Sequence, residues 1–171
     1  MPTRGTLVAI SIDSCTIWYM TKTIEVRRTA SAAPNAVWRV LSDLDAWPQW
    51  LPTVDRVARS AAGVGPGPDA VYRVEQPELP PTDWTVTDWQ PGTAFSWRSR
   101  RPGVVSIADH VIRPLDDGGS EITLRMTFDG PLAWLAHRLY QGMTRSYLQT
   151  EAEALATRAG AEAGAGAADA E

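Results

Sequence analysis

The sequence predicts a single α+β domain in which a curved antiparallel sheet of about seven strands wraps around one long C-terminal helix, with two short helices after the first strand. Two observations carry this prediction. Short segments of alternating apolar and polar residues, separated by Gly and Pro turns, follow one another through the middle of the chain, as in a meandering antiparallel sheet. A long amphipathic segment then follows, and no other element is long enough to cover the apolar face of that sheet.

The size and charge of the chain limit the classes of protein to which it can belong. Its 171 residues provide room for one ordinary domain. The formal net charge of -4 gives no broad positive field, so we expect no nucleic-acid partner. Cys15 is the only cysteine and cannot form an internal disulfide. No Cys/His cluster has zinc spacing, so we expect neither a metal site nor a cofactor.

Residues 1–20 are predicted to be an N-terminal extension outside the fold. They contain a short apolar run at residues 7–10, and Asp13 follows it. A membrane helix needs 18 or more apolar residues in a row, and a signal peptide needs a charged start and a cleavage site. Neither pattern is met, so we expect no membrane span and a cytoplasmic location. The folded domain is expected over residues 21–159.

The first elements follow from hydrophobic spacing. Apolar and charged residues alternate over 23–30, which predicts a half-buried strand. Pro34 suits a first helical turn, and apolar residues at three- and four-residue spacing predict an amphipathic helix over 34–44. The proline-bounded segment 45–52 is long enough for one more helical turn.

The remaining elements are six strands and the long helix. The predicted strands cover residues 54–61, 70–76, 82–89, 93–100, 104–113 and 120–129. Gly130 and Pro131 start the long helix, which is expected to end near Arg158. The helical spacing places the following apolar residues on one stripe of it: Leu132, Leu135, Ala136, Leu139, Met143 and Tyr147. Residues 160–171 are rich in Ala and Gly and have almost nothing to bury, so we expect a disordered tail.

Several motifs resemble those of the START-like superfamily (SRPBCC), which includes polyketide cyclases/dehydrases and lipid-transport proteins. The matching residues are Ala36-Val37-Trp38, Leu41, Asp43 and Trp47-Pro48-Gln49-Trp50, then Trp84-Thr-Val-Thr-Asp-Trp-Gln-Pro-Gly with Phe95 and Trp97, Ala108-Asp109-His110 with Pro114, Gly118-Gly119-Ser120 and Phe128-Asp129-Gly130-Pro131-Leu132. Together they span about residues 22–158. The resemblance implies the helix-grip fold, which agrees with the pattern above. It leaves the activity open, because the superfamily includes carriers, sensors, cyclases and chaperone regulators.

Asp109 and His110 are the candidate residues for proton transfer. They are adjacent in a strand, so only one of them can face inward. If the last hairpin pairs about Asp117, His110 lies opposite Leu124 and faces the cavity. A tighter turn shifts the register by one residue and brings Asp109 inward instead. We favour His110. The inward residue could move a proton, anchor a ligand or serve only the structure.

The other expected site residues are apolar or aromatic and come from the sheet and the last helix. Aromatic pairs on neighbouring strands can stack with or without a ligand. The expected ligand-binding residues are Tyr72, Trp84, Phe95, Trp97, His110, Leu124, Met126, Leu139, Tyr140, Met143 and Tyr147.

These features predict a protein that binds a small hydrophobic molecule, such as a polyketide, an aromatic or a lipid-like compound, between the sheet and the last helix. The alternative, implied by the resemblance, is a polyketide cyclase, aromatase or dehydratase that uses His110 or Asp109 as proton shuttle. HExxH, GxSxG, P-loop and GxGxxG motifs are absent. A third possibility is a module that binds a partner through an exposed apolar patch. The sequence does not determine the oligomeric state.

Overall fold

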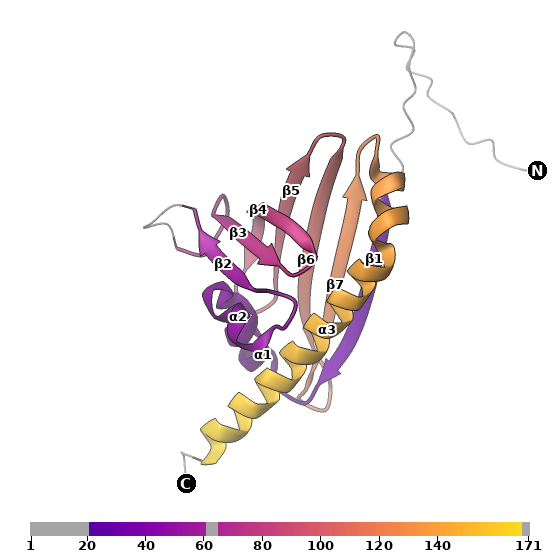
Figure 1. The fold of residues 1–171 in the computed structure, drawn as a ribbon. Coiled ribbons are helices and arrows are strands. Elements are labelled where there is room, and N and C mark those ends of the chain that lie inside the picture. The colour runs from indigo at the N-terminus through magenta and orange to yellow at the C-terminus, as the bar shows by residue number, and fades with distance from the viewer. Residues whose placement is uncertain (1–20, 61–64, 169–171) are drawn as a thin grey trace, which may run out of the picture.

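The structure, a computed structural model, describes residues 21–60 and 65–168. Its seven-stranded antiparallel sheet curves around a long C-terminal helix, and two short helices follow the first strand (Figure 1). The predicted α+β class and helix-grip architecture are therefore confirmed. The elements are β1 (Lys22–Ala30), α1 (Pro34–Ser42), the 3-10 helix η1 (Leu44–Ala46), α2 (Trp47–Trp50), β2 (Arg56–Arg59), β3 (Val71–Gln76), β4 (Leu79–Gln90), β5 (Ala94–Arg101), β6 (Val104–Pro114), β7 (Ser120–Asp129) and α3 (Ala133–Ala168). The predicted extension, residues 1–20, lies outside the described residues.

The strand order follows the chain with a single exception. The order is β1-β7-β6-β5-β4-β3-β2, so neighbours in sequence are neighbours in the sheet from β2 to β7, and short turns are enough to connect them. β1 pairs along its whole length with β7, from Lys22 opposite Phe128 to Ala30 opposite Ser120. The first strand therefore borders the sheet beside the last, where α3 packs against both of them.

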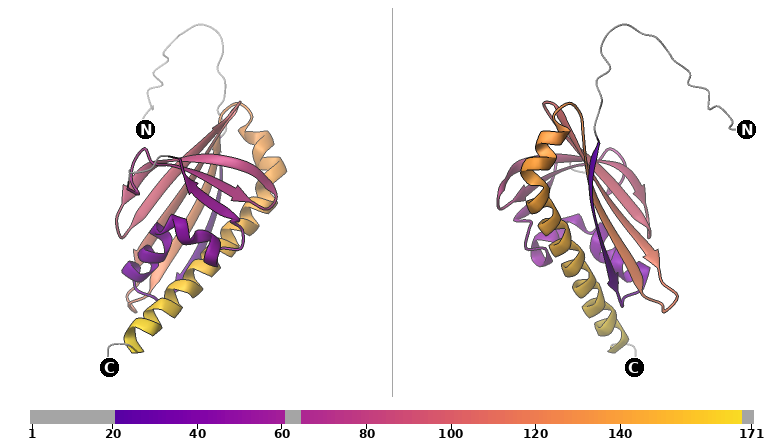
Figure 2. Two further views of the ribbon diagram at one scale, coloured as in Figure 1. Left: turned by 60° about the vertical axis from the view of Figure 1, so that its left-hand side comes forward. Right: turned by 90° about the vertical axis from the view of Figure 1, so that its right-hand side faces the viewer.

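Two irregularities coincide with the bend of the sheet. The register shifts between Val74 and Gln76 in the β3/β4 pair, and between Val86 and Asp88 in the β4/β5 pair. Such bulges increase local twist and bend a strand. Figure 2 shows β2, β3 and β4 arching over the side of the sheet on which α3 lies.

β4 begins earlier than predicted, at Leu79 and not at residue 82. Pro80 and Pro81, which suggest a turn, lie within this strand. They are tolerated because β4 pairs with β5 only from Thr85 to Gln90, so no strand on that side needs their missing N–H groups.

α3 continues to Ala168, beyond the predicted end near Arg158, and includes most of the segment expected to be a disordered tail (residues 160–171). Alanine has the highest helix propensity, which accounts for helix in a segment with little to bury. Ala159 is the last α3 residue that the structure describes as buried, so the following turns add nothing to the core. None of the described helices combines the length and apolarity that a membrane span requires.

The short helices close one end of the sheet. Val37 and Leu41 of α1 are fully buried, as the predicted amphipathic spacing requires. Trp47 lies beneath them, and its indole Nε1 donates a hydrogen bond of 3.0 Å to the Leu41 carbonyl oxygen. A buried indole needs such a partner, so the polar group of Trp47 is satisfied within the core.

A pair of glycine substitutions on either side of the α3 N-terminus tests the junction between sheet and helix. Gly130 has φ +109°, and a Cβ there would lie 2.7 Å from the Gly103 carbonyl oxygen. We expect Gly130→Ala to lower the free energy of unfolding by about 2 kcal/mol, measured by urea titration. Gly142 lies within α3 and has open space around it, so Gly142→Ala should raise that free energy by about 0.5–1 kcal/mol. Equal effects of the two variants would contradict the strained junction.

Candidate functional site

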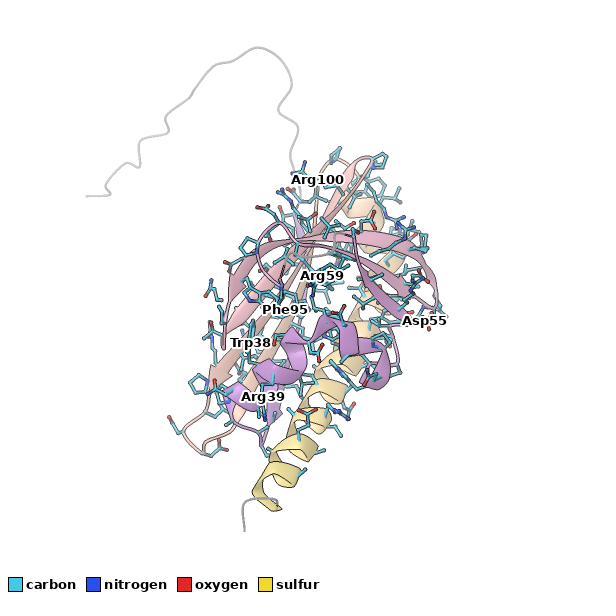
Figure 3. All side chains as sticks on the ribbon, turned by 90° about the vertical axis from the view of Figure 1, so that its left-hand side faces the viewer. Trp38, Arg39, Asp55, Arg59, Phe95 and Arg100 are labelled. Atoms are coloured by element: carbon cyan, nitrogen blue, oxygen red, sulfur yellow. The ribbon has the colours of Figure 1, made fainter. Side chains whose placement is uncertain are left out.

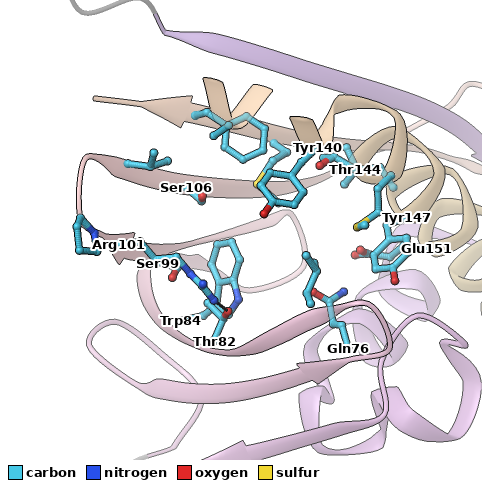
Figure 4. Close-up of a pocket in the computed structure, with 18 residues that line it drawn as sticks. Gln76, Thr82, Trp84, Ser99, Arg101, Ser106, Tyr140, Thr144, Tyr147 and Glu151 are labelled. Atoms are coloured by element: carbon cyan, nitrogen blue, oxygen red, sulfur yellow. Dashed lines mark hydrogen bonds between the residues drawn. The ribbon is translucent and has the colours of Figure 1, made fainter. Parts of the chain in front are cut away.

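A cavity of about 320 Å³ lies between the sheet and the N-terminal half of α3. Its walls come from β3 to β7 and from α3 (Figure 4). The lining residues are Gln76, Leu79, Thr82, Trp84, Ser99, Arg101, Pro102, Val104, Ser106, Met126, Phe128, Ala136, Tyr140, Met143, Thr144, Tyr147, Leu148 and Glu151. This volume falls within the range of small-molecule sites, and the lining combines apolar side chains with a few polar groups as such sites do.

A pair of small inward-facing side chains on β5 and β6 leaves room for the cavity. Phe95 and Trp97 fill the interior along β5, and Ser99 follows them on the same face. Ser99 pairs directly with Ser106 of β6, so two of the smallest side chains lie side by side in the cavity wall. Ala136 faces them from α3 as another small lining residue. The space is a consequence of side-chain volume, not of a gap in the backbone.

His110 is the residue of the Asp109/His110 pair that faces inward. β6 and β7 pair with His110 opposite Leu124, which is the register we favoured, and His110 is 2% exposed. Asp109 lies opposite Arg125 on the other face of the sheet, and it accepts a hydrogen bond of 2.7 Å from Ser96 Oγ. The alternative register, which would bring Asp109 inward, is therefore not the one found, because period 2 directs the Asp109 side chain away from the cavity.

Aromatic rings surround His110 on several sides. Phe95 stacks on the imidazole with ring centroids 4.1 Å apart and an interplanar angle of 13°. The rings of Trp47 and Trp97 each lie 5.9 Å away at steep angles. Such a ring of apolar surface excludes water, so a charge on the imidazole is unfavourable unless an opposite charge is close.

Glu151 of α3 lies close enough to supply such a charge when the imidazole is protonated. Its Oε1 lies 3.1 Å from His110 Nε2, and the two side chains are 13% and 3% exposed. The contact is an ion-pair distance without an aligned hydrogen bond, because Glu151 Oε1 has no hydrogen-bond partner among the described residues. His110 Nδ1 is likewise buried without a partner among them. Since Glu151 lines the cavity and His110 lies behind it, the pair connects the cavity wall to the core.

Of the predicted ligand-binding residues, five line the cavity and six do not. The lining residues are Trp84, Met126, Tyr140, Met143 and Tyr147. Phe95, Trp97, His110 and Leu124 lie in the packed core beside the cavity, where Trp97 supports the wall by stacking on Trp84 at 5.3 Å.

Neither Tyr72 nor Leu139 lines the cavity as predicted: the first is buried elsewhere, and the second is exposed to solvent. Tyr72 is fully buried away from the cavity lining. Burial raises the pKa of its hydroxyl, and the Arg59 guanidinium, 5.4 Å from the ring centroid, opposes that shift. Arg59 lies on the edge strand β2 and is half-buried, whereas Phe95 is fully buried in the core; both lie near the short helices (Figure 3). Leu139 is 65% exposed, because α3 presents Ala136, Tyr140 and Met143 to the cavity instead.

The residues that sequence reasoning missed are mostly polar. They include Gln76, Thr82, Ser99, Arg101, Ser106, Thr144 and Glu151. The alternation on β5 places Ser99 on the inward face, so its position could have been predicted. The pairing with Ser106 required the register, and the approach of Glu151 to His110 required the path of α3 across the sheet.

Comparisons with known proteins agree with this architecture. The family model described as polyketide cyclase / dehydrase and lipid transport matches residues 21–160. The crystal structure of the Zhui aromatase/cyclase from Streptomyces sp. R1128 is similar, with 18% identity, a TM-score of 0.67, and coverage of 82% of this chain and 94% of that chain. Norcoclaurine synthase from Thalictrum flavum, in complex with dopamine and hydroxybenzaldehyde, has 13% identity, a TM-score of 0.65, and coverage of 89% and 95%. At these identities the structural likeness shows the fold alone. No curated protein matches the sequence.

A double-mutant cycle tests the coupling between His110 and Glu151. We expect His110→Phe to lower the free energy of unfolding by about 1–3 kcal/mol, because it leaves the largely buried Glu151 carboxylate beside aromatic rings. Glu151→Leu alone should also destabilise the protein. The double variant should recover most of the loss, since an apolar pair can replace a buried ion pair at little cost. Urea titration of the four proteins measures the coupling, and strictly additive losses would show that the two groups do not interact.

Proposed function

This chain belongs to the polyketide cyclase/dehydrase and lipid-transport family, and from that premise we propose that it binds a small hydrophobic molecule in the cavity between the sheet and α3. The observation that carries the proposal is the cavity itself, about 320 Å³ in volume and lined on one side by Trp84, Met126 and Phe128. An apolar ring or chain placed there would cover side chains that otherwise face a hollow.

The shape and chemistry of the lining favour a ring-containing or branched ligand with few polar groups. Trp84 offers an aromatic face that is held in place by Trp97, and stacking on it would orient a planar guest. Ser99, Ser106, Thr144 and Tyr147 supply hydroxyl groups around the cavity. A hydroxyl or carbonyl oxygen on the ligand can exchange hydrogen bonds with these groups, which gives specificity to an otherwise non-directional contact.

Filling the cavity from within tests binding directly. The probe is N-phenyl-1-naphthylamine, a neutral aromatic compound whose fluorescence rises in apolar surroundings. We expect the unmodified protein to bind it and Ala136→Trp to weaken that binding about tenfold or more, because the indole occupies the volume that the probe needs. Ala161→Trp, on an exposed part of the same helix, is the matched control and should leave the Kd unchanged. Binding that is insensitive to Ala136→Trp would place the probe elsewhere and contradict the proposal.

A second candidate function is a cyclase or aromatase reaction, and the His110–Glu151 pair is the observation that favours it. A carboxylate at the wall of an apolar cavity can take a proton from a carbon that lies between two carbonyl groups. The resulting enolate can attack another carbonyl of the same bound chain, and the conjugate acid can return a proton to the new alkoxide. His110, 3.1 Å behind Glu151, would stabilise the carboxylate and orient it. The similarity in fold to an aromatase/cyclase is consistent with this reading.

The reaction is tested with a linear 3,5,7-trioxo-octanoyl thioester, in which the enolate carbon C2 can attack the C7 carbonyl to close a six-membered ring. Loss of water from the adduct gives an aromatic ring, and the absorbance of that product is followed against the rate without protein. If the second function holds, Glu151→Gln should reduce kcat by about 100-fold or more, while the Kd of the neutral probe changes less than about twofold. Glu153→Gln is the control, because Glu153 lies on the exposed side of the same helix and pairs with Arg28. Turnover that survives Glu151→Gln would exclude this carboxylate as the base.

A further inference from the structure

The cavity has opposite charges at its two ends. Arg101, at the end of β5, lies by the turn between β5 and β6, and Glu151 lies at the far end beside the short helices (Figure 4). Arg101 is exposed, whereas the Glu151 side chain is 13% exposed. The guanidinium therefore marks the open end of the cavity and the carboxylate marks the enclosed end.

The Arg101 guanidinium is held in place by neutral groups alone. Its Nη2 donates to Thr82 Oγ1 at 2.6 Å and to the Pro80 carbonyl oxygen at 3.3 Å. None of the ion pairs among the described residues includes Arg101. In contrast, Arg73 on β3, which is separated from β5 by β4, pairs with Asp83 at 3.1 Å. Hydrogen bonds from β5 to β4 therefore position the Arg101 charge at the open end of the cavity. No ion pair among the described residues neutralises it.

A guanidinium has five N–H donors, and these two hydrogen bonds both use one nitrogen. The remaining donors can form the paired, charge-assisted hydrogen bonds that a carboxylate, sulfonate or phosphate accepts. A neutral carbonyl would leave the positive charge without a counterion. The mouth therefore fits an anionic group better than a neutral one.

From this arrangement, and resting on the proposed function, we propose that the cavity takes an amphipathic anion whose apolar body lies against Trp84 and Phe128 and whose anionic group is held at Arg101. Glu151 defines the orientation, because an anion at the enclosed end would meet a carboxylate of the same sign. The enclosed end instead suits a hydroxyl or another hydrogen-bond donor on the ligand. Arg101 is thus a specificity-determining residue at the opening, distinct from the His110–Glu151 pair.

Two probes that share one ring system isolate the contribution of the anionic group. They are 8-anilino-1-naphthalenesulfonate and its neutral parent, N-phenyl-1-naphthylamine. We expect Arg101→Gln to weaken binding of the sulfonate about five- to tenfold, as for a partly exposed charged contact, and to change binding of the parent less than twofold. The affinity of the unmodified protein for the sulfonate should fall as salt is raised, and that dependence should be smaller in Arg101→Gln.

Arg100→Gln is the matched control, because it removes the same charge from the neighbouring position without altering the cavity lining. Arg100 lies toward the hairpin end of the sheet, away from the short helices (Figure 3). This variant should change the affinity for either probe less than twofold. Ala136→Trp should weaken both probes, which locates both of them in the cavity.

The outcomes separate the two proposals. If both probes bind and Arg101→Gln changes their affinities equally or not at all, the inference about the anion is wrong and the cavity proposal stands. If Arg100→Gln weakens the sulfonate as much as Arg101→Gln does, the effect is one of net charge and the inference is again wrong. If neither probe binds, or Ala136→Trp affects neither, the proposed function itself is contradicted for aromatic guests of this size.

Discussion

The distribution of side-chain volume on the inner face of the sheet is the constraint on which the rest of the molecule depends. The large rings of Phe95, Trp97 and His110, at one end of β5 and β6, contact one another. They also pack against the short helices. The paired serines, Ser99 and Ser106, lie farther along the same two strands. A continuous backbone scaffold can therefore be solid at one end and hollow at the other. The helix grip supplies the two layers, and the side chains decide where the layers separate.

The division into a packed end and a hollow end also explains where the charged groups of the site lie. The His110–Glu151 pair is located where the solid region meets the hollow one, so that one partner lies in the core and the other reaches the cavity wall. Desolvation makes an isolated charge costly at that boundary, and the proximity of the second group offsets the cost. Arg101, by contrast, remains in contact with water and needs no buried partner. The enclosed and open ends of the cavity thus differ in solvation as well as in sign.

The sequence predicted the architecture well because hydrophobic spacing is a local property. Alternation defined β1 and β5 to β7, and the three- and four-residue spacing defined α1. The site was less accessible, because cavity lining depends on how α3 rotates against the sheet. The leucines Leu132 and Leu139 suggested one buried stripe, yet the structure exposes both and buries Ala133, Leu148 and Ala159 instead. Small residues let the helix approach β1 and β7 closely, an advantage that a count of apolar positions does not reveal. Glu151 was missed because its contact with His110 also depends on how α3 lies against the sheet, and the two residues are distant in the sequence.

The turn that contains Gly103 is connected to the start of α3, and this connection bears on how a guest can enter the cavity. The Leu132 amide donates to the Gly103 carbonyl oxygen at 3.0 Å, and Gly103 belongs to the same β5–β6 turn that follows Arg101. This hydrogen bond connects the residue that precedes α3 to the turn that follows Arg101. Passage of a guest through this aperture would rely on rotation of rim side chains such as Tyr140, which is fast on the nanosecond scale, and would not require the helix to swing away from the sheet.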